Sequence, residues 1–261
     1  RTWAATPYAP GSMVLAADLG FFKASDFLVS GDEHQRLVSR MSLAGSPVEG
    51  LEINAGFSLA MDDNSHVRFE PGSAQSVGDP FLGIRYGIGL TDWFALGAGV
   101  QSVFPSGKGF SQLSTDGIST RILFAFDFTP IPGLLLALNA GYHFDNSRFI
   151  FEHSINEFQG FAACVNPHDQ VLAGLGASYQ IGPVAPFLEL HTAQAVGADG
   201  VGFADSPSLL TAGVRAWPLS QHTLHLLAAA DIGLAGVHPP AGKGRTPPYQ
   251  VILGAAYHFG V

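Results

Sequence analysis

The chain has 261 residues, of which 47% are hydrophobic and only 13% are charged, and its formal net charge at pH 7 is −9. An ordinary soluble domain has roughly 25% charged residues. No stretch of this chain reaches the roughly 18 uninterrupted apolar residues of a transmembrane helix. The negative charge argues against a nucleic acid partner. Together these features favour a membrane protein that crosses the bilayer with β-strands.

One pattern recurs along the whole chain: short segments in which apolar residues alternate with small or polar ones. A period of two residues is typical of a strand, because successive side chains point to opposite faces of a sheet. The segment 133–145 is the clearest case, and nothing in the chain has the pattern of a layer that would cover its apolar side. We therefore interpret the apolar side as facing lipid and the other side as facing a barrel interior. The apolar side of this segment comprises Leu134, Leu136, Leu138, Ala140, Tyr142 and Phe144.

The same alternation predicts twelve strands in chain order. They cover residues 12–22, 35–44, 50–61, 78–88, 92–104, 117–128, 133–145, 169–181, 184–194, 208–217, 222–235 and 248–260. The connections that follow even-numbered strands are short, and those that follow odd-numbered strands are long. This alternation is typical of outer-membrane barrels, which have short periplasmic turns and longer outer loops.

These observations predict an all-β protein, an antiparallel up-and-down transmembrane β-barrel of twelve strands in a bacterial outer membrane. An even strand count puts both termini on the periplasmic side. No linker interrupts the series, so residues 1–261 are expected to form a single barrel domain. Aromatic residues near strand ends, such as Phe144, Tyr257 and Phe259, fit the girdles of membrane interfaces. The alternative is a soluble barrel whose aromatic residues form the core.

The side of the strands opposite the apolar one carries charges of both signs. Ions in a narrow lumen are costly unless they are paired, so these side chains are expected to form a network across the lumen. Two interpretations stay open: the network fills the lumen structurally, or its arginines line a pore that selects anionic or zwitterionic solutes. The predicted lumen charge network comprises Asp18, Arg40, Glu52, Arg85, Arg121, Asp127, Glu189, Arg215 and Asp231.

Motifs for catalysis or cofactors are scarce. His191 lies two residues from Glu189 on the same strand face, as a base and its orienting carboxylate do, but no serine is placed nearby with it. The histidines show no metal-ligand spacing. Glycines such as Gly87 and Gly97 lack a following helix, so they are interpreted as lumen-side or turn residues. We expect no enzyme activity, no catalytic or metal site and no cofactor.

The loop at about 146–168 is the longest connection and carries an unusually apolar stretch. It is expected either to fold into the barrel as a plug or to bind a partner. If it is a plug, deleting residues 159–166 should raise conductance. The single cysteine, Cys164, lies in this loop, so an intrachain disulfide is excluded.

The segment Gly78–Gly109 (GDPFLGIRYGIGLTDWFALGAGVQSVFPSGKG) resembles a hairpin of many Gram-negative outer-membrane barrels, in a GD-x-x-LG-x-(K/R)-Y form followed by a P-(T/S)-G loop. Segments 209–219 and 247–259 are similar to closing hairpins of such barrels. The resemblance is nearest to the barrel domain of OmpA-type proteins. It implies a structural or scaffolding role in the envelope, with outer-membrane lipid and other envelope proteins or peptidoglycan as partners. The alternative is a small porin-like solute channel lined by Arg40, Arg85, Arg121 and Arg215.

Overall fold

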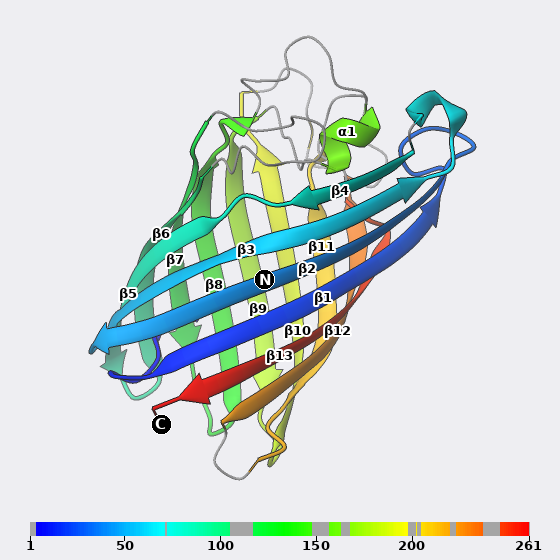
Figure 1. Ribbon diagram of the computed structural model, residues 1–261. Helices are drawn as coiled ribbons and strands as arrows, with labels where there is room; N and C mark the ends of the chain where they lie inside the picture. Colours follow the sequence, from blue (N-terminus) through cyan, green and yellow to red (C-terminus); the bar gives the residue numbers. More distant parts are fainter. Residues whose placement is uncertain are drawn as a thin grey trace.

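The computed structural model is a closed ring of antiparallel strands (Figure 1). It describes residues 4–70, 72–104, 117–147, 157–162, 168–197, 202, 205–219, 223–236 and 246–260. Thirteen strands lie within these residues, and they fill twelve positions around the ring. They are β1 (Met13–Ser25), β2 (Glu33–Val48), β3 (Leu51–Asn64), β4 (Ser73–Val77), β5 (Phe81–Thr91), β6 (Phe94–Val103), β7 (Ser119–Phe128), β8 (Leu134–Phe144), β9 (Gln170–Tyr179), β10 (Val184–Ala195), β11 (Ser208–Ala216), β12 (Leu224–Ala235) and β13 (Tyr249–Phe259).

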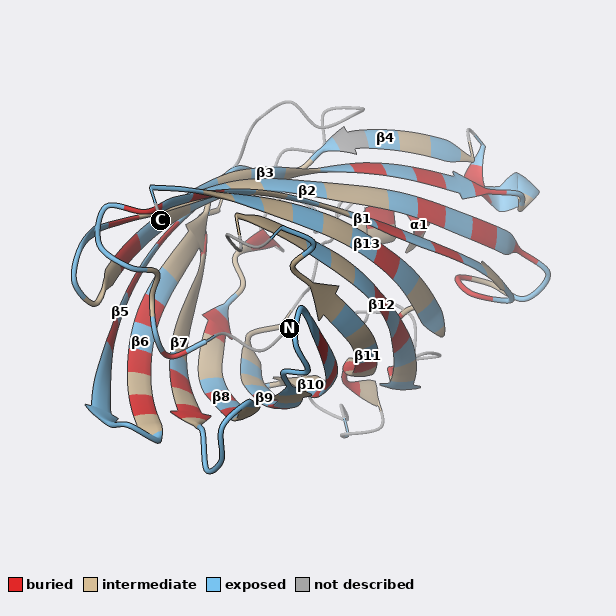
Figure 2. Ribbon diagram, turned by 90° about the horizontal axis from the view of Figure 1, so that it is seen from below, coloured by how far each residue is buried: buried red, intermediate tan, exposed pale blue. Residues whose placement is uncertain are grey.

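The ring closes between the first and last strands. Met13 lies opposite Phe259, and Phe21 lies opposite Val251, so β1 and β13 pair over most of their lengths. Around the rest of the ring consecutive strands pair, except that β4 and β5 both pair with β3; Figure 2 shows the ring from below. Because no edge is left between β1 and β13, the backbone groups there are bonded without water, as a membrane requires. The predicted twelve-strand antiparallel barrel is confirmed.

The fourth position in the ring differs from the prediction. Strand 78–88 was expected after a long loop, but the structure has two strands, β4 and β5, which both pair with β3 and are separated by Gly78, Asp79 and Pro80. Proline has no N–H to give to a ladder, so a strand bends or breaks there. Backbone pairing resumes on both sides of the break because β3 runs on without interruption.

Exposure alternates along the strands, as the period-two pattern predicts. On β8, Leu136 and Leu138 are exposed, while Ala137 and Asn139, which alternate with them, are buried. Figure 2 shows the same alternating bands on most strands around the ring. Large apolar side chains facing outward all round a barrel are typical of a lipid-facing belt. At the end of β13, Phe259 is 48% exposed and Tyr257 is 43% exposed, which does not fit the alternative in which the aromatic residues form the core of a soluble barrel.

One short α-helix is described, α1 (Glu157–Ala162), in the connection between β8 and β9. Its Phe158 is buried against Phe22 of β1, Phe27 of the next loop and Phe69 of the 3-10 helix η1 (Val67–Phe69). Among the residues that the structure describes, no helix is long and apolar enough to span a membrane. Most of the loop 146–168 lies outside the described residues, Cys164 included, so the plug hypothesis stays a prediction.

Candidate functional site: the barrel interior

The first described residues of the chain lie inside the barrel. The N–H of Ala5 donates to Asp127 Oδ2 of β7 at 2.7 Å, and Arg85 Nη1 of β5 donates to the carbonyl oxygen of Ala4 at 3.0 Å. Ala5 is 1% exposed and packs against Ala95 and Ala125 on the inward faces of β6 and β7. In Figure 2 this part of the chain lies within the ring of strands. We call residues 4–8 the N-terminal segment.

Two glycines form the seat of the N-terminal segment. Gly87 of β5 and Gly97 of β6 are direct cross-strand partners. A Cβ added at Gly97 would lie 2.7 Å from the carbonyl oxygen of Ala5, and one added at Gly87 would overlap that oxygen. Any larger residue at either position would displace the segment, so glycine is needed for this close backbone approach. The segment then continues to Tyr8, whose ring packs edge-on against His258 with centroids 5.5 Å apart.

The predicted inward charges meet as pairs between neighbouring strands. Arg85 forms a buried ion pair with Glu52 of β3. On the far side of the ring, Arg215 of β11 donates to Glu189 Oε1 of β10 at 2.8 Å, and His191 Nε2 lies 3.0 Å from Glu189 Oε2. Glu52 and Glu189 therefore each have a guanidinium beside them, which compensates for the hydration that these carboxylates lose on burial.

Other charged residues of the predicted network do not contact the Glu52–Arg85 or Glu189–Arg215 pairs in the described contacts. Asp231 of β12 accepts a hydrogen bond from Thr211 at 2.7 Å, and Asp18 lies directly opposite Arg40 across β1 and β2. Arg121 lines a cavity on the wall. The described contacts thus join the predicted residues in several local groups. That the groups act as one network across the lumen stays a prediction.

The cavity lies on the inner wall over β7 to β11 and has a volume of about 260 Å³. Its lining combines leucines with a few polar side chains, and Gly174 adds no side chain to it. The lining residues are Arg121, Leu123, Asn139, Gln170, Leu172, Ala173, Gly174, His191, Thr192, Ala193, Pro207 and Leu209.

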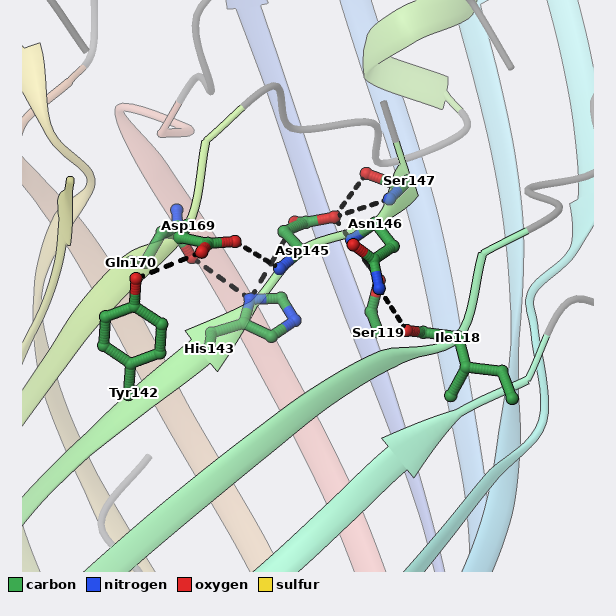
Figure 3. A network of polar contacts seen from close by, with 9 residues as sticks. All are labelled: Ile118, Ser119, Tyr142, His143, Asp145, Asn146, Ser147, Asp169 and Gln170. Atoms are coloured by element: carbon green, nitrogen blue, oxygen red, sulfur yellow. Dashed lines mark hydrogen bonds and ion pairs between the residues drawn. The ribbon is translucent and has the colours of Figure 1, made fainter. Parts of the chain in front are cut away.

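A set of hydrogen bonds joins the ends of β7, β8 and β9 (Figure 3). Asp169 accepts from the hydroxyl of Tyr142 at 3.0 Å and from the N–H of Asp145 at 2.9 Å. Next to Asp169, Gln170 Oε1 lies 3.4 Å from His143 Nδ1. Gln170, a lining residue of the cavity, is therefore held by a bonded rim rather than by a loose loop end.

The N-terminal segment in the lumen is a feature that the sequence analysis missed. Its residues lack the alternating pattern, and nothing in them marks a position inside the ring. The sequence did contain one sign of such a segment, the glycines at positions 87 and 97 of the barrel wall. They were interpreted only as lumen-side or turn residues. The register between β5 and β6 places these two glycines directly opposite each other, so that together they leave room for the N-terminal segment.

No family model matches the chain, and no curated protein matches it. Similar solved structures exist. An outer-membrane channel from Pseudomonas putida F1 superimposes with a TM-score of 0.69 at 13% identity, covering 98% of each chain. The KdgM porin gives 0.57 at 8% identity over 95% of this chain and 99% of that one. The CymD monoaromatic hydrocarbon channel gives 0.51 at 11% identity over 97% and 89%.

These likenesses concern the fold, because the identities are low. They give no support to the expected resemblance to OmpA-type proteins in particular. The neighbours are barrels of outer membranes, in agreement with the lipid-facing belt of this chain. By its fold, the chain is a closed antiparallel β-barrel of twelve strand positions.

Proposed function

We propose that this protein is an outer-membrane channel for small solutes and that the N-terminal segment constricts its lumen. The observation that carries the proposal is the content of the barrel. The inner wall carries charged side chains and a cavity of about 260 Å³. The N-terminal segment crosses the interior and is held there by Arg85 and Asp127. The similar channel and porin structures support the same choice.

The orientation in the membrane is part of the proposal. The start of β1 and the end of β13 meet at the end of the barrel that carries the short connections, such as 49–50 and 92–93. Short turns lie on the periplasmic side in outer-membrane barrels. Both termini are therefore assigned to the periplasm, and lipid is the partner of the outward apolar side chains.

The scaffolding role expected from the OmpA-type resemblance has no observation in its favour, and the solute channel replaces it as the preferred function. A role for envelope proteins or peptidoglycan as partners rests on that resemblance alone. We also retain the proposal that the chain is not an enzyme. Arg215 shares Glu189 with His191, so this group is arranged as a compensated ion cluster.

The test is single-channel recording of the purified full chain in a planar bilayer. We expect ion conductance that rises severalfold when residues 1–8 are deleted, because the N-terminal segment no longer narrows the lumen. Gly87→Ala should also raise conductance, since the new methyl group would meet the Ala5 carbonyl oxygen. The matched control is Gly89→Ala, two residues along the same strand, where a Cβ would meet no atom within 4 Å.

A folded barrel that stays silent in all four forms would overturn the proposed channel. Equal conductance of the Gly87→Ala and Gly89→Ala variants would be compatible with a channel but would overturn the proposal that the N-terminal segment constricts it.

A further inference from the structure

The helix α1 lies against the wall opposite the strands that it connects. It belongs to the connection between β8 and β9, yet its Phe158 packs against Phe22 of β1. Counted through β7, β6, β5, β3 and β2, β8 is six strand positions from β1, which is half of the twelve-position ring. Figure 1 shows α1 beside β4 at the end of the barrel with the long connections, and Figure 2 shows it within the outline of the ring. The described part of the β8–β9 connection therefore lies on the far side of the barrel mouth.

The side chains beneath α1 come from the inward faces of β1 and β2. Phe22 lies directly opposite Arg36, and both are buried. The same two strand faces carry Asp18 and Arg40, four residues further into the barrel. His34, on the inward face of β2, is 0% exposed. The helix therefore covers lumen surface and not lipid-facing surface. We call the residues that it covers the α1 seat: Phe22, Phe27, His34, Arg36 and Phe69.

Two phenylalanines of the helix pack into the α1 seat. The ring centroid of Phe158 lies 5.8 Å from that of Phe69 and 6.0 Å from that of His34. The ring centroid of Phe161 lies 5.1 Å from those of Phe27 and His34, with both contacts edge-on. Buried aromatic contacts of this kind are favourable. Because a six-residue helix is not stable by itself in water, the place of α1 depends on these contacts.

Arginines of the opposite wall hold both ends of α1. Arg36 Nη1 donates to the carbonyl oxygen of Phe161 at 3.1 Å, and its guanidinium carbon lies 4.9 Å from the centroid of the Phe161 ring. The last carbonyl groups of a helix have no partner within it, so this bond satisfies one of them. Asp62 lies 3.7 Å from the same guanidinium and compensates its charge. At the other end, Glu157 lies 3.8 Å from Arg68 of η1.

Hydrogen bonds beneath the α1 seat fix its shape without help from the helix. His34 Nε2 lies 3.2 Å from Asp62 Oδ1, and Asn64 Nδ2 lies 3.3 Å from His34 Nδ1. Asn64 also donates to Asp32 Oδ2 at 2.7 Å, and Asp32 accepts from the N–H of Phe27 at 2.6 Å. These residues belong to β2, β3 and the loop between β1 and β2. The seat therefore stays formed when α1 leaves it.

From this arrangement we infer that α1 is a movable outer constriction, which sets the size of the solutes that enter the barrel from outside. The inference rests on the channel and the orientation of the proposed function, and it adds a second barrier to the one formed by the N-terminal segment. Docked on its seat, α1 narrows the mouth, and undocked it leaves the mouth wide. Undocking breaks contacts of the helix but none of the strand ladder, so the barrel stays folded in both states.

The first experiment measures access to the lumen from outside and does not depend on conductance. Cells export the full chain with Cys164→Ser and Ser42→Cys, which places one thiol on the inward face of β2 further into the barrel than the seat. Intact cells are treated with a small methanethiosulfonate or with a polymer-linked maleimide. We expect Phe158→Ala to speed labelling by the polymer reagent about tenfold or more, because a truncated buried phenylalanine weakens docking. Labelling by the small reagent should change far less.

Two further variants show whether the effect belongs to the docking of α1. Arg36→Gln should speed labelling by the polymer reagent as Phe158→Ala does, because the Phe161 carbonyl oxygen loses its charged donor. Val67→Ala, at an exposed position of η1 next to the seat, is the control and should leave this labelling slow. Heat-modified gel mobility confirms that each barrel is folded.

The second experiment fixes the docked state by a cross-link. Arg68→Cys and Glu157→Cys replace the ion pair between η1 and α1 in a Cys164→Ser background, and a short bismaleimide with a reducible spacer joins them. With Phe158→Ala also present, we expect planar bilayer recordings to show low conductance in the joined protein. Reduction of the spacer should raise the conductance severalfold, because α1 is then free to leave its seat.

The outcomes separate this inference from the proposed function. Equal labelling by the polymer reagent with and without Phe158→Ala, or conductance that the cross-link does not change, would overturn the inference and leave the channel. Faster labelling of Phe158→Ala in a barrel that conducts in no form would support the movable α1 and overturn the channel. If Phe158→Ala were labelled only in broken cells, α1 would face the periplasm, and both the orientation and the inference would be wrong.

Discussion

At the scale of single residues, the buried ion pair of Glu52 and Arg85 joins the wall to the N-terminal segment. Arg85 is 8% exposed and Glu52 is 4% exposed, and Arg85 also donates to the Ala4 carbonyl oxygen. Removing one partner of such a pair leaves a charge that neither water nor protein compensates. Breaking the pair therefore lowers the stability of the barrel by more than the net attraction between Glu52 and Arg85 contributes to it.

We predict that Glu52→Leu lowers the free energy of unfolding by about 3–5 kcal/mol, because the Arg85 guanidinium stays buried without its carboxylate. Urea unfolding in phospholipid vesicles measures the change, and Glu52→Gln should recover part of it through a remaining hydrogen bond. The control is Glu33→Gln, in an exposed pair with Lys23 at 3.1 Å, where at most about 1 kcal/mol is expected. Equal losses for Glu52→Leu and Glu33→Gln would contradict the prediction.

Residue faces were predictable from the sequence, whereas residue partners were not. The period-two rule places Glu52, Arg85, Glu189 and Arg215 on the inward side without any structure. Which of them meet depends on the register between strands, and a shift of one residue reverses every face. The cavity illustrates the same limit, since Leu123, Leu172 and Leu209 come from strands that are far apart in the chain.

At the scale of elements, α1 has six residues, too few to be stable as an isolated helix in water. Its stability comes from packing: Phe158 is 2% exposed against Phe22, Phe27 and Phe69. Sequence alone marked an apolar stretch in the loop 146–168 but gave no helix, because the partners of Phe158 lie on β1 and in two other loops. The interruption between β4 and β5 was missed although its cause is local. Pro80 was placed inside the predicted strand 78–88 instead of at a break.

Phe158→Ala is expected to release α1 while the barrel stays folded, because the lost contacts belong to the helix rather than to the strand ladder. Hydrogen exchange should show protection of the α1 amides falling to the level of exposed loops, with strand amides unchanged. Val67→Ala, a truncation at a 76% exposed position of η1, is the control and should leave α1 protected. Loss of strand protection in Phe158→Ala would contradict this account.

At the scale of the whole molecule, the outward apolar belt defines how the barrel meets the bilayer. Leu253 is 56% exposed in the middle of β13, opposite Leu19 of β1 and Ala228 of β12. Leu219, which is 46% exposed, lies in the short connection after β11. This large-scale arrangement was the most predictable part of the protein, because each strand repeats the same pattern and errors at single boundaries do not change it.

A charge placed at these two positions should report depth in the membrane. We predict that Leu253→Arg destabilises the barrel by about 2–4 kcal/mol and Leu219→Arg by about 0–1 kcal/mol, since arginine is costly at the bilayer midplane and tolerated near the interface. Reversible urea unfolding in vesicles measures both. Similar values for the two variants would contradict the assignment of β13 as membrane-spanning.

The pairing of β1 with β13 has a consequence for folding. The two partners of this seam are the first and last strands of the described chain, so their contacts join residues that are far apart in the sequence, such as Met13 and Phe259. Non-local pairing of this kind makes folding slow, because the entropy of closing the whole chain is lost before the contacts form. During synthesis β1 has no partner for its free edge until residue 259 is made. A chain released early is therefore left with an open edge, the feature by which strands of separate molecules aggregate.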